Sequence, residues 1–237
     1  MLLSVALKKK LPSFEIDLSF TCRPGKISVM IGPSGGGKTT IVRMLAGLEK
    51  PDKGVITAGD EVWFDSGRGI FIPPRKRKPG YVFQDYTLFP HLDLFENAAF
   101  AAVERKDVYE LFKIFQISHL AGRKPYMVSG GERQRCAICQ ALARRPRVLL
   151  MDEPFSALDF ITRRTLRDEM KNIKSKFAIP IIYVTHDINE ALFLADEMLP
   201  VVEGKLDRSW INQPFPGSDN DTRIKRAARE VKLALAY

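Results

Sequence analysis

A short glycine-rich segment holds the residues best suited to chemistry. The stretch "GPSGGGKT" begins at residue 32, fits the spacing G-x-x-x-x-G-K-[ST], follows an apolar strand-like run and opens a helical pattern. Glycines let successive backbone N–H groups turn inward around phosphate oxygens, and the helix start adds partial positive charge. We expect Lys38 to reach the β- and γ-phosphates of a nucleotide and Thr39 to bind Mg²⁺. The predicted nucleotide contacts are Gly32, Pro33, Ser34, Gly35, Gly36, Gly37, Lys38, Thr39 and Thr40.

Two adjacent carboxylates would complete such a site. The run "VLLMDEP" puts Asp152 and Glu153 at the end of an apolar strand. Asp152 is expected to be the carboxylate on the metal side, and Glu153, at the mouth of the site, to act as general base on an attacking water. The alternative for Glu153 is a solvated carboxylate at a strand end. With the first loop, the pair predicts hydrolysis of a nucleoside triphosphate.

A second serine- and glycine-rich turn, "VSGGE" at residues 128–132, precedes the helix-forming run "ERQRCAICQALARR". A turn that opens a helix can bind an anion, yet nothing nearby in the sequence offers one. The alternative is that Ser129 only caps the helix. Within the run, Cys136 and Cys139 form a C-x-x-C pair, but no second pair or nearby histidine completes a metal site. We therefore expect two buried helical cysteines.

A lone histidine, His186, follows the apolar run "IPIIYVT". A histidine after a strand is more often a structural residue than a catalytic one, so the residue by itself leaves its role open.

Composition indicates an ordinary globular protein. Hydrophobic residues make up 45% and charged residues 27% of 237, enough chain for a large α/β domain. No apolar run approaches the roughly 18 residues that span a bilayer, and the N-terminal lysines follow the apolar stretch, the reverse of a secretory signal. We therefore expect a cytoplasmic protein. The balance of 37 basic and 28 acidic residues, net +9, suits nucleic acid, anionic lipid or a nucleotide, or is only a basic surface.

Strands and helices that would position these residues alternate along the chain. Two strands are expected within residues 13–31, the first containing Phe14, followed by a helix from Lys38 to Gly47 and short strands over 53–83. The pattern is helical from 92 to 145, and strands and helices then alternate again. This order predicts an α/β fold with a mainly parallel sheet, an antiparallel N-terminal β part and an inserted helical subdomain.

A single domain over residues 1–237 is predicted from this organisation. Its core covers about 1–90 and 146–210, the helical subdomain about 91–145, and a polar C-terminal tail about 211–237.

Six motifs in order make the chain resemble the nucleotide-binding subunits of ABC transporters, P-loop NTPases. Beside the glycine loop and "DEP", "VFQD" at 82–85 resembles the family's Q-loop and "VSGGE" its signature, usually LSGGQ. "SALD" at 156–159 resembles the D-loop, and "VTHD" at 184–187 the switch.

The resemblance implies a composite site. Two copies would face each other head to tail as a homodimer, with each ATP between the first loop of one copy and the signature of the other. It implies that His186 contacts the γ-phosphate and orients the water, and that Gln84 serves metal and catalysis. The same resemblance assigns nucleotide contacts of the partner copy to Ser129, Gly130, Gly131 and Asp159.

The chain most resembles one branch of the family. "PPRKRKPGYVFQDYTLFPHLDLFENAAF" is similar to the same region of importers for molybdate, tungstate, sulfate and ferric iron, and Glu132 resembles the molybdate/tungstate members. Such importers imply membrane-spanning permease subunits, an indirect substrate-binding protein, and a place at the cytoplasmic face of the membrane. A docking groove for the permease is expected from Tyr86, Leu88, Phe89 and Pro90, with a core turn as the alternative.

Two departures from the family stand out. The aromatic residue that stacks on adenine in relatives is replaced by the stretch "LKKKLPS", which leaves base selectivity open. After about Lys205 too little chain follows for the β-rich sensing domain of many relatives, so feedback through such a domain is not expected.

The rival interpretation is a soluble ABC ATPase that acts on nucleic acid or ribosomes. Repair and chromosome members carry long insertions between the first loop and the signature, and translation members carry two cassettes; this chain has neither. No nucleic acid partner is therefore expected. A binding module without turnover is disfavoured by the presence of Lys38, Asp152, Glu153 and His186.

Overall fold

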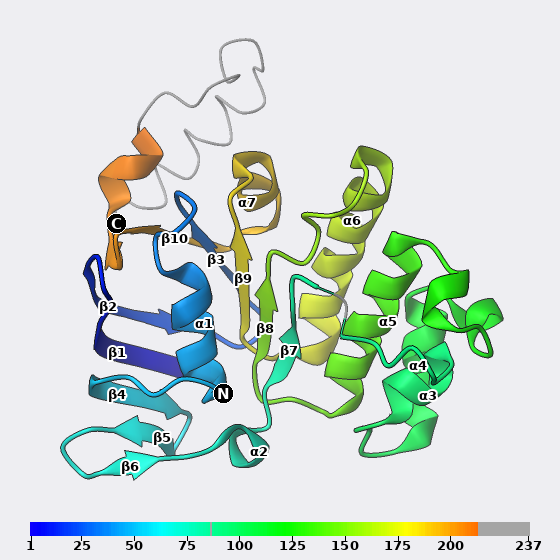
Figure 1. Ribbon diagram of the computed structural model, residues 1–237, viewed down its shortest axis with the longest axis horizontal. Helices are drawn as coiled ribbons and strands as arrows, with labels where there is room; N and C mark the ends of the chain where they lie inside the picture. Colours follow the sequence, from blue (N-terminus) through cyan, green and yellow to red (C-terminus); the bar gives the residue numbers. More distant parts are fainter. Residues whose placement is uncertain (86, 213–237) are drawn as a thin grey trace.

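Two β-sheets and a group of helices make up the protein (Figure 1). The computed structural model describes residues 1–85 and 87–212. The predicted C-terminal tail therefore lies outside the described residues from 213 onward, and so does Tyr86.

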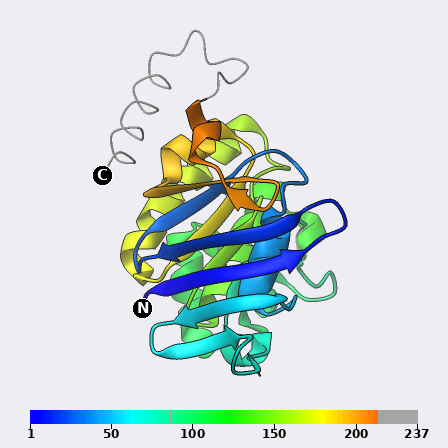
Figure 2. The same cartoon turned by 90° about the vertical axis from the view of Figure 1, so that its left-hand side faces the viewer.

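The first sheet is antiparallel, with strand order β2-β1-β4-β5-β6. Figure 2 looks onto this sheet, with β1 and β2 crossing the front. Its strands are β1 Leu3–Lys10, β2 Glu15–Cys22, β4 Lys53–Ala58, β5 Glu61–Asp65 and β6 Ile70–Phe71.

The second sheet has the order β11-β10-β3-β9-β8-β7, and all its pairings are parallel except that of β11. Parallel neighbours bring the carboxyl ends of β3, β7, β8 and β9 to one edge, where ligands usually bind in such sheets. Its strands are β3 Ile27–Ile31, β7 Gly80–Val82, β8 Leu149–Asp152, β9 Ile181–Thr185, β10 Glu197–Val202 and β11 Lys205–Leu206.

Helices cover the parallel sheet on both faces. Helix α1 lies between the two sheets, while α3, α4 and α5 gather at the far end of the molecule (Figure 1). The helices are α1 Lys38–Ala46, α2 Pro74–Arg77, α3 Leu94–Ala99, α4 Arg105–Ile114, α5 Gly130–Ala143, α6 Phe160–Phe177 and α7 Ile188–Leu194, with short 3₁₀ turns η1 Ser118–Leu120, η2 Pro125–Met127 and η3 Arg208–Asn212.

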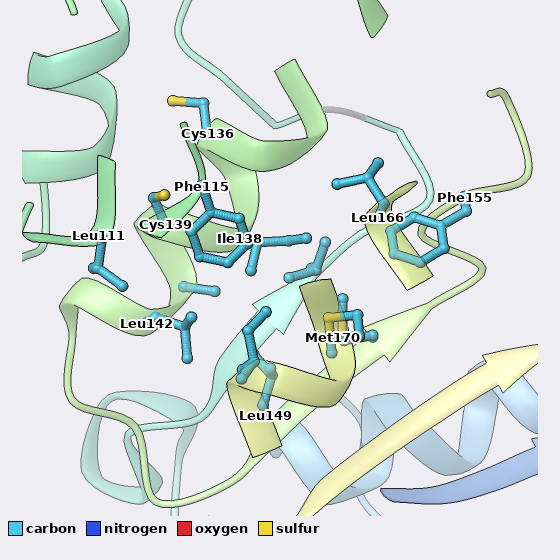
Figure 3. Close-up of a cluster of buried hydrophobic side chains, with 14 of the residues drawn as sticks. Leu111, Phe115, Cys136, Ile138, Cys139, Leu142, Leu149, Phe155, Leu166 and Met170 are labelled. Carbon is cyan, nitrogen blue, oxygen red and sulfur yellow. The ribbon is translucent and has the colours of Figure 1, made fainter. Parts of the chain in front are cut away.

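The parallel strands consist mostly of apolar residues, because side chains on alternate faces enter two different cores. In β9, Ile181 and Tyr183 pack toward the helical end, whereas Ile182 and Val184 pack toward α1 and the antiparallel sheet. Figure 3 shows the helical-end core, where Cys139 of α5 and Met170 of α6 belong to one cluster with Leu149 of β8. The predicted fold class is confirmed, and so is the burial of Cys136 and Cys139.

One local prediction was wrong. Phe14 does not lie inside a strand, because "LSVALKKK" forms the additional strand β1 and residues 11–14 form the connection to β2.

The basic segment around α2 contains a buried arginine. Arg77 is fully buried and its guanidinium donates to four backbone carbonyls, those of Ile72, Met44, Leu45 and Trp63. Two of these carbonyls end helix α1, so Arg77 fastens that helix to the β-rich region.

No helix among the described residues is long and apolar enough to cross a membrane.

Candidate nucleotide-binding site

The glycine-rich loop runs from the end of β3 into α1. Gly32 closely abuts the neighbouring strand, because a Cβ there would meet the Val201 carbonyl oxygen at 2.0 Å. Gly35 and Gly37 have left-handed φ angles of 78° and 92°, which glycine adopts without strain. The backbone thus turns sharply into the start of α1, where free N–H groups and the helix dipole favour an anion.

Lys38 folds back over this loop. Its Nζ donates to the carbonyl oxygens of Gly32, at 2.9 Å, and Pro33, at 2.8 Å, and the side chain is only 5% exposed. Burial lowers the pKa of Lys38, an effect opposed by Glu153 and Asp152 nearby. The ammonium group is therefore held at the loop with little water around it.

Asp152, at the end of β8, faces the start of α1. The Thr39 hydroxyl donates to Asp152 Oδ1 at 3.1 Å, and the Tyr81 hydroxyl donates to Oδ2 at 3.3 Å. Burial raises the pKa of Asp152, although both hydrogen bonds act in the opposite direction. These oxygens are of the kind that Mg²⁺ prefers, so Thr39 and Asp152 fit a metal carried in with a nucleotide. Tyr81 was not predicted as part of the site.

Glu153 and His186 meet at the mouth of the site. Glu153 Oε2 lies 3.0 Å from His186 Nδ1, and the Glu153 backbone has a left-handed φ of 45°. Such a conformation is strained for a residue other than glycine, and it turns this side chain away from the strand direction. The strain is held by a hydrogen bond from the Glu153 N–H to the Val184 carbonyl at 3.1 Å.

A cavity of about 310 Å³ lies over the glycine loop and reaches Lys38, Thr39 and Glu153. Part of its wall is the β1–β2 connection, where Leu11, Pro12 and Ser13 line the cavity with Phe14. The first three belong to the stretch that replaces the adenine-stacking residue of relatives. The Phe14 ring packs against the loop, since a Cβ on Gly37 would lie 3.3 Å from its Cε2. The alternating burial of β1, which places this connection, was readable from Leu3, Val5 and Leu7. The remaining lining residues are Ser34, Gly35, Gly36, Gly37, Lys38, Thr39, Thr40 and Glu153.

The second glycine turn is not part of this cavity. Ser129 caps α5 and forms a capping box with Glu132, while Gly130 and Gly131 begin the helix. Gly131 is in close contact with α6, because a Cβ there would meet Thr162 Cγ2 at 2.3 Å. Within the described chain, none of the three residues of this turn lines the cavity over the first loop.

Further predicted site residues also lie outside the cavity lining, namely Gly32, Pro33, Gln84, Asp152, Asp159 and His186. Asp159 is exposed and caps α6, accepting from the N–H groups of Ile161 and Thr162 at 3.0 Å each. Gln84 is exposed, two residues after β7, on the same sheet edge as Asp152.

Comparison with known proteins identifies the architecture. The sequence pattern of the ABC transporter family matches residues 16–156, more than half of the chain. The chain belongs to the ABC transporter family. As an ABC chain it carries the family's ATPase domain.

Several relatives of this ABC chain are named as import ATP-binding proteins. The molybdate/tungstate import ATP-binding protein WtpC of Archaeoglobus fulgidus is 36% identical over 100% of this chain and 98% of its own length. The molybdenum import ATP-binding protein ModC of Vibrio parahaemolyticus is 39% identical over 89% of this chain and 59% of its own. The trehalose/maltose import ATP-binding protein MalK of Thermococcus litoralis is 40% identical over 80% and 53%. This chain therefore spans only about half the length of some relatives.

A solved structure has the same ABC fold. The dimeric structure of an ATP-binding cassette in a post-hydrolysis state, bound to ADP and Pi, matches with a TM-score of 0.71 at 28% identity, covering 88% of this chain and 97% of that chain.

Proposed function

We propose that this chain hydrolyses ATP and thereby powers an ABC importer for molybdate, tungstate or a related oxyanion. The observation that carries the ATPase proposal is the cavity over the glycine loop, which Lys38, Thr39 and Glu153 line, with Asp152 hydrogen-bonded to Thr39. These groups can neutralise phosphate charge and activate water, which is most of what phosphoryl transfer requires of a protein.

Each residue has a distinct role in the proposed reaction. Lys38 and the loop N–H groups bind the phosphates of ATP, while Thr39 and Asp152 would hold Mg²⁺, with Gln84 as a further ligand and catalytic contact. Bound there, Mg²⁺ supplies positive charge to the phosphate oxygens. Glu153 accepts a proton from the attacking water, and His186, in hydrogen-bond contact with Glu153, orients that carboxylate and the water.

A homodimer would complete the site. The signature residues Ser129, Gly130 and Gly131 lie at the start of a 14-residue helix and outside the chain's own cavity. They would bind the nucleotide of a second copy, with Asp159 beside it. The dimeric cassette with the same fold supports this arrangement. ATP would then hold two copies together, and hydrolysis would release them.

The membrane subunits would dock on a groove of about 400 Å³ beside the Q-loop. Its lining is mostly apolar and includes the basic residues Arg75 and Arg144, a combination that suits an amphipathic helix of a permease. Of the residues expected there, Phe89 lines the groove, whereas Leu88 packs against the core and Pro90 is exposed outside the lining. Docking would hold the chain at the cytoplasmic face of the membrane. The principal lining residues are Leu48, Arg75, Phe83, Phe89, Phe100 and Arg144.

The oxyanion cargo is supported by the relative named for molybdate and tungstate, which matches end to end. Relatives named for trehalose/maltose and for spermidine/putrescine match over 53% and 52% of their lengths.

One experiment tests the whole proposal. The tagged chain is extracted from native membranes in mild detergent, and the co-purifying proteins and the ATPase activity are determined. A stoichiometric polytopic membrane protein, with hydrolysis stimulated in proteoliposomes by a binding protein loaded with tungstate, is the expected result. Recovery with ribosomes or DNA would overturn the transport role, and stimulation by maltose or spermidine in place of tungstate would overturn the cargo.

A further inference from the structure

In the second glycine turn, the Glu132 carboxylate is hydrogen-bonded to Ser129. Glu132 Oε2 accepts hydrogen bonds from the Ser129 N–H at 2.7 Å and from the Ser129 hydroxyl at 2.8 Å, while the Glu132 N–H donates back to Ser129 Oγ at 3.3 Å. A serine hydroxyl carries a single proton. In this structure that proton is given to Glu132 and is not available to a phosphate.

The Glu132 side chain is negatively charged at neutral pH. The Ser129 N–H lowers the pKa of Glu132, and His119 and Arg135 act in the same direction more weakly. The carboxylate lies in the first turn of α5, at the end of the helix whose N–H groups would meet the nucleotide of a second copy. Because a hydrogen bond to Ser129 Oγ would bring a phosphate within about 3 Å of that hydroxyl, the carboxylate and the phosphate would be close neighbours.

We infer that Glu132 opposes ATP-driven pairing of two copies, by withholding the Ser129 hydroxyl and by placing a negative charge beside the partner's nucleotide. This inference rests on the composite site proposed above. It makes Glu132 a residue that sets how much ATP is needed to close the dimer, while catalysis itself remains with Glu153.

Glutamine at this position would act differently. Glu132 Oε2 takes both Ser129 hydrogen bonds, and an amide oxygen in its place would accept both as well, but more weakly because it carries no charge, so the hydroxyl proton is given up to a phosphate more readily. Glutamine also serves in a capping box, so Glu132→Gln keeps the helix start. The substitution therefore removes the charge and weakens both hydrogen bonds with little other change.

A purely structural role for Glu132 predicts a different outcome. An acidic residue stabilises a helix N-terminus through the helix dipole, so Glu132→Gln would then slightly lower thermal stability and leave pairing unchanged or weaker. The inference predicts stronger pairing in spite of that loss, so the two explanations differ in the sign of the effect on dimer formation.

The test measures ATP-dependent dimerisation by sedimentation in a Glu153→Gln background, which slows ATP consumption. Adding Glu132→Gln is expected to lower the ATP concentration at half-dimerisation by on the order of tenfold, with a smaller gain at high salt because salt screens the repulsion. Adding Ser129→Ala to both is expected to remove part of this gain. Glu110→Gln is the matched control, since Glu110 is an exposed carboxylate on α4 that pairs with Lys113.

The possible outcomes distinguish failure of the Glu132 inference from failure of the proposed composite ATP site. If no variant dimerises with ATP, the composite site is wrong and the inference falls with it. If the Glu153→Gln chain dimerises and Glu132→Gln leaves the midpoint unchanged or raises it, the inference alone is overturned. An equal gain from Glu110→Gln would also overturn it, because the effect would then come from net charge.

Discussion

The imidazole of His186 and the carboxylate of Glu153 are in direct contact, with Nδ1 3.0 Å from Oε2. They follow the neighbouring parallel strands β9 and β8, so the sheet itself brings them together. Glu153 is mostly shielded, with 19% of its side chain exposed, whereas His186 is 56% exposed. This arrangement suits a shielded base oriented by a more exposed partner.

Replacing Glu153 with glutamine should stop turnover and leave ATP bound. The amide keeps the size of the side chain but cannot take a proton from water, so hydrolysis should fall by about 10² to 10⁴-fold. Phosphate release and ATP binding by calorimetry are measured on the same preparation, with Glu110→Gln as the control. Hydrolysis near the wild-type rate would exclude Glu153 as the base.

Replacing His186 with alanine tests the orienting role separately. We expect kcat to fall by roughly 10²-fold or more with KM nearly unchanged, because the imidazole acts on the reacting groups and not on the bound phosphates in the loop. His119→Ala is the matched control, since His119 is an exposed histidine in the 3₁₀ turn η1. A change confined to KM would show that His186 only helps to bind ATP.

Phe14 is predicted to support the base of the nucleotide. It lines the cavity beside the glycine loop, and stacking of a base on an aromatic ring contributes about 1–3 kcal/mol. Phe14→Ala should therefore weaken ATP binding by roughly 10-fold in calorimetry, while the affinity for inorganic triphosphate, which has no base, stays the same. Equal weakening of both ligands would mean that Phe14 only shapes the loop.

Much of this site could be predicted from sequence because motif residues follow parallel strands, and such strands end at one edge. Lys38, Asp152 and Glu153 were found in this way. Arg77 could not be, since its carbonyl partners at Met44 and Leu45 are more than thirty residues away and nothing in a basic run distinguishes a buried arginine. Strand β1 was missed for a different reason. Its first half shows a readable alternation at Leu3, Val5 and Leu7, but three lysines end it and break the apolar pattern.

A ligand for Ser129 could not be predicted from the local sequence for another reason. Capping of α5 by Ser129 and Glu132 satisfies the local pattern completely, so nothing in the chain's own hydrogen bonds requires a ligand there. The position of Ser129 outside the cavity is a property of the folded chain, and it is what motivates a second copy.

Asp152 should reduce the stability of the chain when no metal is bound. Burial raises its pKa, so the folded state binds the proton more tightly than the unfolded state does. The destabilisation is therefore absent below the unfolded pKa of about 3.9 and fully present once the pH exceeds the raised folded value. Asp152→Asn should raise the thermal midpoint at pH 7 by about 2–4 °C, a gain that disappears as the pH falls toward 4, and should abolish Mg²⁺-dependent hydrolysis. Calorimetric scans in EDTA between pH 4 and 8 measure this, with Asp60→Asn as the control at an exposed aspartate. A lower midpoint at pH 7 would mean that the hydrogen bonds from Thr39 and Tyr81 outweigh the cost of burial.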